Sequence, residues 1–182
     1  MKLKSFLITA ILMVATISLS AQTNPRSGKF GVGIDDISTS PNFLFKYYLT
    51  DNFSMNFITG IDLEFPGADA PEGLTKLDGY NLRLGLAGMY HFNMDRVSPY
   101  LGLEAIYGIK QNAGYYAVEP DPKNNVMLGL ILGADYFLFE KFSLGIKQNL
   151  NFDFQLSRDI PVEETDMFIN TTTQFTARYY FN

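Results

Sequence analysis

The stretch FSLGIKQNLNFDFQL, residues 142–156, alternates strictly between two kinds of residue. Apart from Gln148, every second position from Phe142 to Leu156 is apolar, and the positions between them are polar, small or charged. A period of two is the pattern of a β-strand, because successive side chains point to opposite faces. Strands in soluble proteins usually have about five or six residues, whereas this one would extend about 50 Å at roughly 3.3 Å per residue. Its length and its almost wholly apolar face need an explanation.

The start of the chain has the layout of a secretory signal peptide. Lys2 and Lys4 precede an uncharged apolar run over 6–19, and small residues follow up to Ala21. A transmembrane helix needs about 20 apolar residues, so we expect a signal peptide over 1–21, cleaved near Ala21. Loss of both lysines changes the formal charge from −5 to about −7, which argues against a nucleic-acid partner. The chain has no cysteine, which excludes disulfides and thiolate metal sites.

The alternation of residues 142–156 recurs along the rest of the chain and predicts eight strands. They cover 30–34, 43–49, 53–65, 80–92, 101–109, 126–138, 142–156 and 169–181. Short connections alternate with longer ones that are rich in Pro, Gly and acidic residues. The short ones are 51–52, 93–96 and 139–141, and the long ones are 66–77, 111–125 and 157–167, while the connection near 38–42 is short but falls on the long side. This order is typical of an up-and-down antiparallel meander.

The two faces of these strands differ in a way that indicates which one points outward. No apolar-face position is Asp, Glu, Lys or Arg. A charge there would cost roughly 2–4 kcal/mol if the face met lipid. The other face carries Gly31, Gly33, Gly60, Gly85, Gly102, Gly108, Gly129, Gly133 and Gly145. Glycines suit the interior of an eight-stranded barrel, which is only just wide enough for side chains. The predicted fold is therefore all-β, an eight-stranded antiparallel up-and-down transmembrane β-barrel over 28–182, preceded by a short tail over 22–27.

The charged residues of the inward face are expected to form a balanced interior polar network, because buried charges must be paired. If strands 53–65 and 80–92 pair about the centre of the loop between them, Asp62 faces Arg83 and forms a cross-strand ion pair. Glu104 and Lys147 lie at a similar height. The predicted network comprises Lys46, Asp62, Glu64, Arg83, Glu104, Lys110, Asp135, Lys147, Asp153 and Arg178.

Enzymatic chemistry has one candidate pair. His91 is the sole histidine, and the same pairing places Ser54 opposite it, near the end with short turns. A Ser–His pair can be a nucleophile and its base, but no third member and no metal motif accompany it. We interpret the pair as a hydrogen-bonded structural contact and expect no catalytic, cofactor or metal site.

The long loops carry more acidic than basic residues. Such loops are usually only solvated, but they could also bridge to lipid head groups through divalent cations or engage a basic partner. Tyr115 and Tyr116 are candidate contact residues on this surface, or else a continuation of the strand before them.

At the level of pattern, the chain resembles the small OmpA/OmpX-like outer-membrane β-barrels over about 28–182. The resemblance is carried by the eight strands and by SPYLGLEAIYG (98–108), GLILGADYFLFEKFSLGIKQNLNF (129–152) and FTARYYF (175–181). It implies contact with outer-membrane lipid and lipopolysaccharide, and assembly by the barrel-insertion machinery. Members of the family usually end on an aromatic residue, whereas here Asn182 follows Phe181. The peptidoglycan-binding second domain of larger members is not expected.

Together these patterns predict a monomeric, non-enzymatic barrel of the cell outer membrane with a structural or surface-interaction role. Small and charged side chains would fill its lumen, and acidic loops would face outward. The alternatives are a narrow channel for small solutes, a lipid-modifying barrel enzyme and a soluble lipocalin-like periplasmic barrel.

Overall fold

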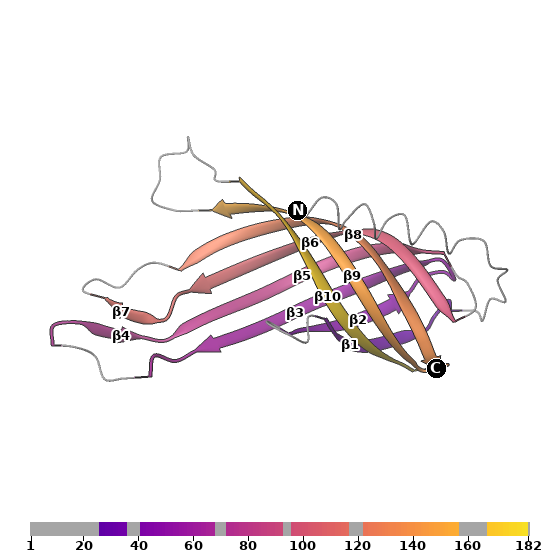
Figure 1. The fold of residues 1–182 in the computed structure, drawn as a ribbon, viewed down its shortest axis with the longest axis horizontal. Helices are drawn as coiled ribbons and strands as arrows, with labels where there is room; N and C mark the ends of the chain where they lie inside the picture. Colours follow the sequence, from indigo (N-terminus) through magenta and orange to yellow (C-terminus); the bar gives the residue numbers. More distant parts are fainter. Residues whose placement is uncertain are drawn as a thin grey trace.

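The computed structural model describes residues 26–35, 41–67, 72–92, 96–116, 122–156 and 167–181. Eight antiparallel strands close a barrel in the order β1-β10-β9-β8-β6-β5-β3-β2 (Figure 1). Their bounds are β1 Phe30–Asp35, β2 Asn42–Tyr48, β3 Phe53–Glu64, β5 Gly79–His91, β6 Val97–Gln111, β8 Lys123–Phe139, β9 Phe142–Leu156 and β10 Met167–Phe181. This confirms the predicted eight-stranded up-and-down barrel. The predicted signal peptide and Asn182 lie outside the described residues.

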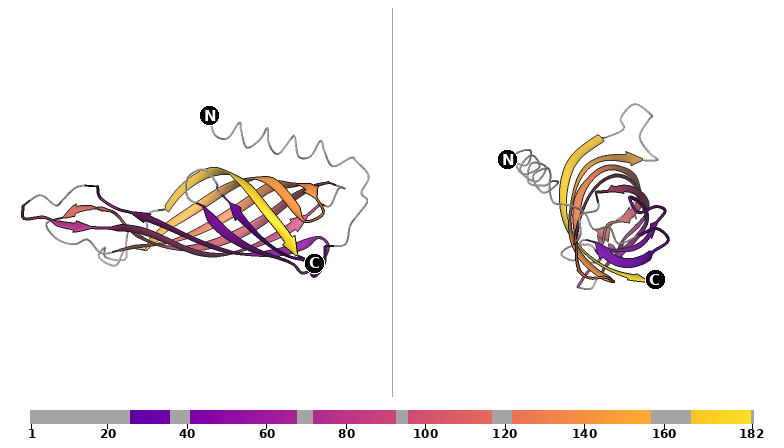
Figure 2. Two further views of the ribbon diagram at one scale, coloured as in Figure 1. Left: turned by 90° about the horizontal axis from the view of Figure 1, so that it is seen from below. Right: turned by 90° about the vertical axis from the view of Figure 1, so that its right-hand side faces the viewer.

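The barrel has two unlike ends. At the short-turn end, residues 49–52 join β2 to β3 and residues 140–141 join β8 to β9, and this is also where β5 ends at His91 and β6 begins at Val97. At the opposite, long-loop end, β4 (Thr75–Leu77) pairs with β7 (Gly114–Tyr116) beyond the rim (Figure 2). This two-stranded ribbon continues the β5–β6 pair and occupies part of two segments that were expected to be loops. No helix among the described residues is long and apolar enough to cross a membrane.

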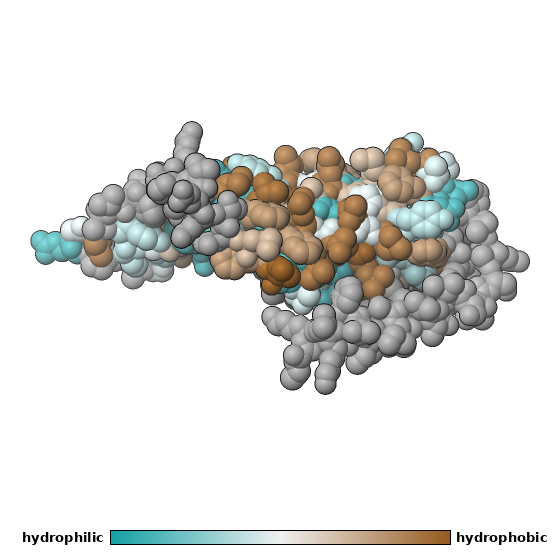
Figure 3. Space-filling view, turned by 90° about the horizontal axis from the view of Figure 1, so that it is seen from above, coloured by the Kyte–Doolittle hydropathy of each residue, from teal (hydrophilic) through white to brown (hydrophobic). Residues whose placement is uncertain are grey.

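The two faces of the barrel wall point as the sequence pattern predicts. Outward residues such as Leu84 and Leu103 are 53% and 64% exposed. On the face shown in Figure 3, hydrophobic side chains cover the middle of the barrel, and hydrophilic ones gather toward the ribbon. Inward charged residues such as Lys46, Asp135 and Arg178 are buried. The long alternating stretch 142–156 forms β9, one unbroken strand of 15 residues.

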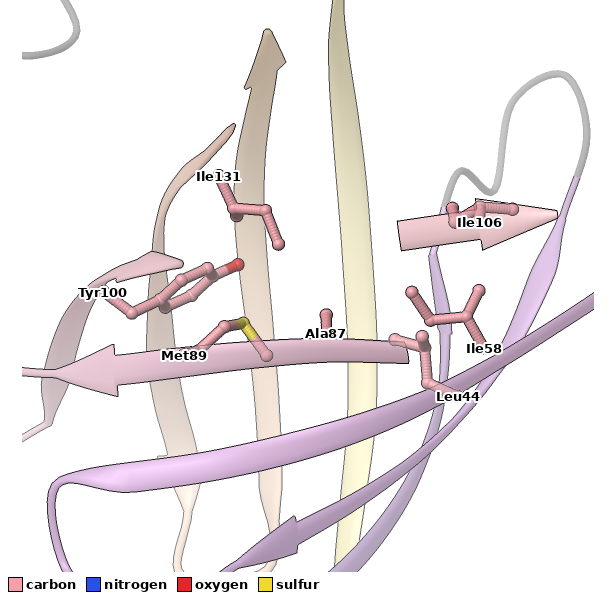
Figure 4. Close-up of a cluster of buried hydrophobic side chains, with 7 residues drawn as sticks. All are labelled: Leu44, Ile58, Ala87, Met89, Tyr100, Ile106 and Ile131. Carbon is pink, nitrogen blue, oxygen red and sulfur yellow. The ribbon is translucent and has the colours of Figure 1, made fainter. Parts of the chain in front are cut away.

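The interior corrects one expectation, since it is filled by more than small and charged side chains. A hydrophobic cluster lies inside the wall, formed by Leu44, Ile58, Ala87, Met89, Tyr100, Ile106 and Ile131 (Figure 4). These residues come from neighbouring strands β2, β3, β5, β6 and β8. Aliphatic groups fill a narrow lumen without needing partners, whereas each buried polar group must be hydrogen-bonded. The lumen therefore holds a hydrophobic cluster as well as charged side chains.

Candidate functional site

Charged side chains of alternating sign form a continuous chain across the lumen. Each member comes from a different strand. In order, this ion-pair chain consists of Glu104 (β6), Lys147 (β9), Asp35 (β1), Arg178 (β10), Asp135 (β8) and Lys46 (β2). The members carry three negative and three positive charges, so the chain is neutral as a whole.

Each cation in the middle of the ion-pair chain bridges two carboxylates. Lys147 Nζ lies 3.4 Å from Glu104 Oε2 and 2.8 Å from Asp35 Oδ2. Arg178 Nη2 lies 3.2 Å from the other oxygen of Asp35, and Arg178 Nη1 contacts Asp135. Paired and hydrogen-bonded in this way, the charges avoid the large cost of an isolated buried ion.

The last pair of the ion-pair chain, Lys46 and Asp135, spans the barrel. Lys46 Nζ lies 3.3 Å from Asp135 Oδ2, and β2 and β8 stand opposite each other in the closed strand order. Every member of the ion-pair chain is at most 5% exposed. The side chains of opposite walls therefore meet inside the lumen.

The inward glycines make room for the ion-pair chain. Except for Asp35, every member has a glycine as a cross-strand partner, in the pairs Lys46–Gly31, Glu104–Gly129, Asp135–Gly145, Lys147–Gly133 and Arg178–Gly33. A Cβ at Gly33 would lie 2.7 Å from Arg178 Cγ, and one at Gly129 would lie 2.7 Å from Glu104 Cγ. Real side chains do not tolerate such contacts, so a long charged residue and a glycine share one layer of the lumen.

The register of β3 and β5 differs from the predicted one by two residues. Ser54 pairs with Met89, and Asp62 pairs with Asn81. The expected contacts nevertheless form diagonally, because a shift of two keeps side chains on the same face. Arg83 Nη2 lies 3.0 Å from Asp62 Oδ2.

The remaining predicted network residues lie nearer the long-loop end and outside the ion-pair chain. Glu64 and Lys110 are exposed and line an open depression of about 540 Å³ together with Asp62. Asp153 is half-buried and accepts a hydrogen bond from Asn125 at 3.0 Å. The charged network predicted from the sequence therefore divides into the buried ion-pair chain and a group of solvated residues nearer the long-loop end. Asp35 was left out of the predicted network but belongs to the ion-pair chain. The alternation of β1 places it on the inward face, and this is the signal by which it could have been included.

His91 lies at the short-turn end, between two serine hydroxyls. Its Nε2 is 2.9 Å from Ser54 Oγ, and its Nδ1 is 3.1 Å from Ser98 Oγ. All three residues are fully buried. Ser98 also accepts a hydrogen bond of 2.6 Å from Arg26 Nη1. The rings of Tyr48 and Tyr100 pack against the imidazole, with ring centroids 5.1 and 5.3 Å from its own.

Both printed hydrogen-bond partners of the His91 ring are serine hydroxyls, so neither contact supplies the carboxylate that orients the imidazole of a catalytic triad. Either neutral tautomer satisfies the two contacts, because each hydroxyl can donate or accept. The expected lack of enzymatic activity stays a prediction.

Arg26 was expected in the tail before the barrel, but it is only 7% exposed and sits in the barrel mouth. Its guanidinium lies 4.4 Å from the centroid of the Phe137 ring. The segment is held by Asp51, whose Oδ1 accepts the backbone N–H of Ser27 at 2.9 Å and that of Arg26 at 2.7 Å. These two hydrogen bonds lower the pKa of the Asp51 carboxyl below its ordinary value of 3.8. Nothing in the local sequence pattern distinguishes Arg26 from a solvated tail residue.

The tyrosines proposed as loop contacts belong to the ribbon. Tyr115 and Tyr116 are half-buried in β7 and pair with Lys76 and Thr75 of β4. They thus lie in a separate two-stranded sheet beyond the end of β6, and their role as contact residues stays a prediction. No group of three or more His, Asp or Glu residues in the described part of the chain could hold a metal ion.

Comparison with solved structures shows what this barrel is similar to. The N-terminal β-barrel domain of Pseudomonas aeruginosa OprF aligns with a TM-score of 0.54 at 12% identity, covering 87% of this chain and 100% of that domain. A major outer membrane protein of Thermus thermophilus aligns with a TM-score of 0.47 at 15% identity, over 84% of this chain and 98% of the other. Ail, the attachment invasion locus protein of Yersinia pestis, gives 0.41 at 12% identity, over 85% and 98%.

No protein-family model and no curated protein sequence matches the chain. At this level of identity the OprF likeness concerns the fold alone. The fold is that of an outer-membrane β-barrel.

Proposed function

We propose that the protein is an integral outer-membrane β-barrel with a structural or surface-interaction role. The observation that carries the proposal is the combination of a closed wall with apolar side chains outside and an ion-pair chain inside. In water this arrangement would expose the apolar face and bury the charges, both of which are unfavourable. In lipid the outer face needs no further burial, and a closed sheet leaves no unpaired edge in the hydrocarbon.

The filled lumen supports an anchoring role over a conducting one. The pair Lys46–Asp135 bridges opposite walls, and the hydrophobic cluster fills a further part of the lumen. The barrel would then hold the ribbon and the loops of the long-loop end at the cell surface, where a partner could bind. We further propose that it is monomeric, contacts phospholipid and lipopolysaccharide, and is assembled by the barrel-insertion machinery.

A paired substitution tests the membrane assignment. Leu130 faces outward and pairs with Leu103 and Leu150, so Leu130→Arg should cost roughly 2–4 kcal/mol or prevent assembly. Gln155, exposed near the long loops, is the control, and Gln155→Arg should change stability by about 0.5 kcal/mol or less. The measurement is the folded fraction on unheated denaturing gels after carbonate extraction of membranes. Equal effects, or recovery of the native protein in the soluble periplasm, would contradict the proposal.

The orientation can be tested because the chain has no cysteine. Lys76→Cys in the ribbon should react with a membrane-impermeant maleimide on intact cells. Lys141→Cys in a short turn should react only after lysis. The reverse pattern would contradict presentation of the long-loop end at the surface. A stable conductance in planar bilayers would favour the narrow channel instead.

A further inference from the structure

The mouth of the barrel at the short-turn end contains a pocket of about 720 Å³ that is lined mainly by basic and aromatic residues. Its walls include Lys29, Arg96 and Lys141, its floor includes Arg26, and Glu140 is the one acid among the described lining residues. The sequence as a whole has 14 Lys and Arg against 19 Asp and Glu. A cationic pocket is therefore a local feature of an otherwise acidic protein.

Backbone hydrogen bonds anchor the three residues that carry the rim cations, Lys29, Arg96 and Lys141. The carbonyl of Lys29 accepts the backbone N–H of Tyr48 at 3.0 Å. In the same way, the carbonyl of Arg96 accepts from Phe137 at 2.7 Å, and that of Lys141 accepts from Tyr180 at 2.8 Å. All three donors also line the pocket. The backbone of each of these residues is thus bonded to that of an aromatic residue, although the three come from segments far apart in the sequence.

The floor supplies a buried positive charge. Arg26 donates to Ser98 and lies against the Phe137 ring, and the carboxylate of Asp51, which accepts its backbone N–H, is not part of the pocket lining. Beside Lys29, Arg96 and Lys141, Glu140 is the one carboxylate of the described lining. The described lining therefore has a net positive charge, which a bound anion would neutralise.

The outer side of the pocket is apolar. Leu138 and Phe139 belong to its lining, and Phe139 is 73% exposed. The register of β8 and β9 shifts between Phe137 and Phe139, an irregularity of the kind that re-aims side chains. A ligand that matches both parts has an anionic group for the cations and an apolar chain for Leu138 and Phe139.

We propose that this pocket binds the headgroup of an anionic phospholipid, with the phosphate at Lys29, Arg96 and Lys141 above Arg26. The inference rests on the proposed function, because an outer-membrane barrel places its short turns at the periplasmic leaflet, where phospholipid headgroups meet the rim. A cation near a membrane surface strengthens anionic binding by about fivefold. The three rim cations together should therefore give well over a tenfold preference for an anionic over a zwitterionic lipid.

The test uses the full chain in nanodiscs of phosphatidylcholine that contain a minor fraction of phosphatidylglycerol with the same acyl chains. Native mass spectrometry then counts the lipids retained on the released protein. We expect retention of phosphatidylglycerol over phosphatidylcholine by at least tenfold. The triple variant Lys29→Gln/Arg96→Gln/Lys141→Gln should lose that preference, whereas Lys76→Gln/Lys123→Gln, with exposed lysines at the long-loop end, should keep it. If the triple variant fails to fold, the single changes Arg96→Gln and Lys141→Gln should each lower retention severalfold.

Separate outcomes identify separate errors. Failure of the native protein to enter nanodiscs would contradict the proposed function. Entry without a preference for phosphatidylglycerol, or a preference that survives in the triple variant, would overturn the lipid site alone. Displacement of phosphatidylglycerol by inorganic phosphate at equal concentration would also overturn it, because the ligand would then be a soluble anion.

Discussion

Replacing Asp135 by asparagine removes one charge from the ion-pair chain with almost no change in shape. Asp135 is fully buried, lies 3.3 Å from Lys46, and also contacts Arg178. Arg178 keeps its second partner, Asp35, at 3.2 Å. Lys46 keeps no carboxylate partner among the described residues, so the substitution leaves a buried ammonium group without its counter-ion.

The expected loss of unfolding free energy is about 3–5 kcal/mol, the usual cost of removing one member of a buried ion pair. Asp62→Asn is the matched control, because it also breaks a carboxylate–cation pair. The side chains of Arg83 and Asp62 are 18% and 30% exposed, and pairs open to solvent contribute only about 0–1 kcal/mol. The difference between the variants should thus be at least about 2 kcal/mol.

The chain has no tryptophan, so unfolding is best followed by the fraction of faster-migrating folded protein on unheated gels across a urea series in lipid vesicles. Adding Lys46→Met to Asp135→Asn should recover part of the loss, because the unpaired cation is then removed. Equal midpoints and slopes for Asp135→Asn and Asp62→Asn would refute the reasoning. A double variant no more stable than Asp135→Asn would show that the unpaired ammonium is not the cause.

Three further outcomes are expected. Gly85→Ala, whose Cβ would lie 2.8 Å from a backbone oxygen inside the wall, should cost about 1–3 kcal/mol, whereas Gly88→Ala on the outer face, 3.3 Å from the nearest side-chain atom, should be nearly neutral in the same urea assay. His91→Gln should leave membrane lipid composition unchanged by mass spectrometry, and a lipid species lost only in this variant at equal folding would indicate an enzyme. Because the pKa of the Asp51 carboxyl is lowered in the folded protein, its stabilising contribution is present above about pH 3.8 and is lost as the pH falls through the folded pKa. Asp51→Asn should therefore lower the thermal midpoint more at pH 7 than at pH 2.5. An equal decrease at both pH values would contradict this.

Most of the inward-facing charged residues could be identified from the sequence, but the ion pairs that they form with one another could not. Lys46, Glu104, Asp135, Lys147 and Arg178 all have the inward parity, and parity is a local property of a strand. Which carboxylate meets which cation depends on the tilt and closure of the wall. The pairing of Lys46 with Asp135 across the diameter joins strands that are far apart in the chain.

The arrangement of residues in the barrel mouth at the short-turn end could not have been derived from the alternating sequence pattern. Arg26 precedes the first strand and belongs to no alternating pattern. Its backbone N–H nevertheless donates to Asp51 and its guanidinium to Ser98, and these two hydrogen bonds place it in the mouth of the barrel. Likewise, Lys29, Arg96 and Lys141 are isolated cations in the sequence. They share one pocket only because the closed strand order brings the segments that carry them to one rim.

The sequence by itself determined the number of barrel strands, their antiparallel order and the face that points outward. It could do so because a period of two and the exclusion of charge from one face are properties of each strand alone. Only the tertiary structure decided the register, including the pairing of Ser54 with Met89, and with it the membership of the ion-pair chain. The physical reason is that a shift of two residues leaves every side chain on its own face, so the alternating pattern is the same before and after the shift. The choice depends on contacts between side chains of different strands, such as the ion pairs across the lumen and the glycine paired with each long charged side chain on the neighbouring strand.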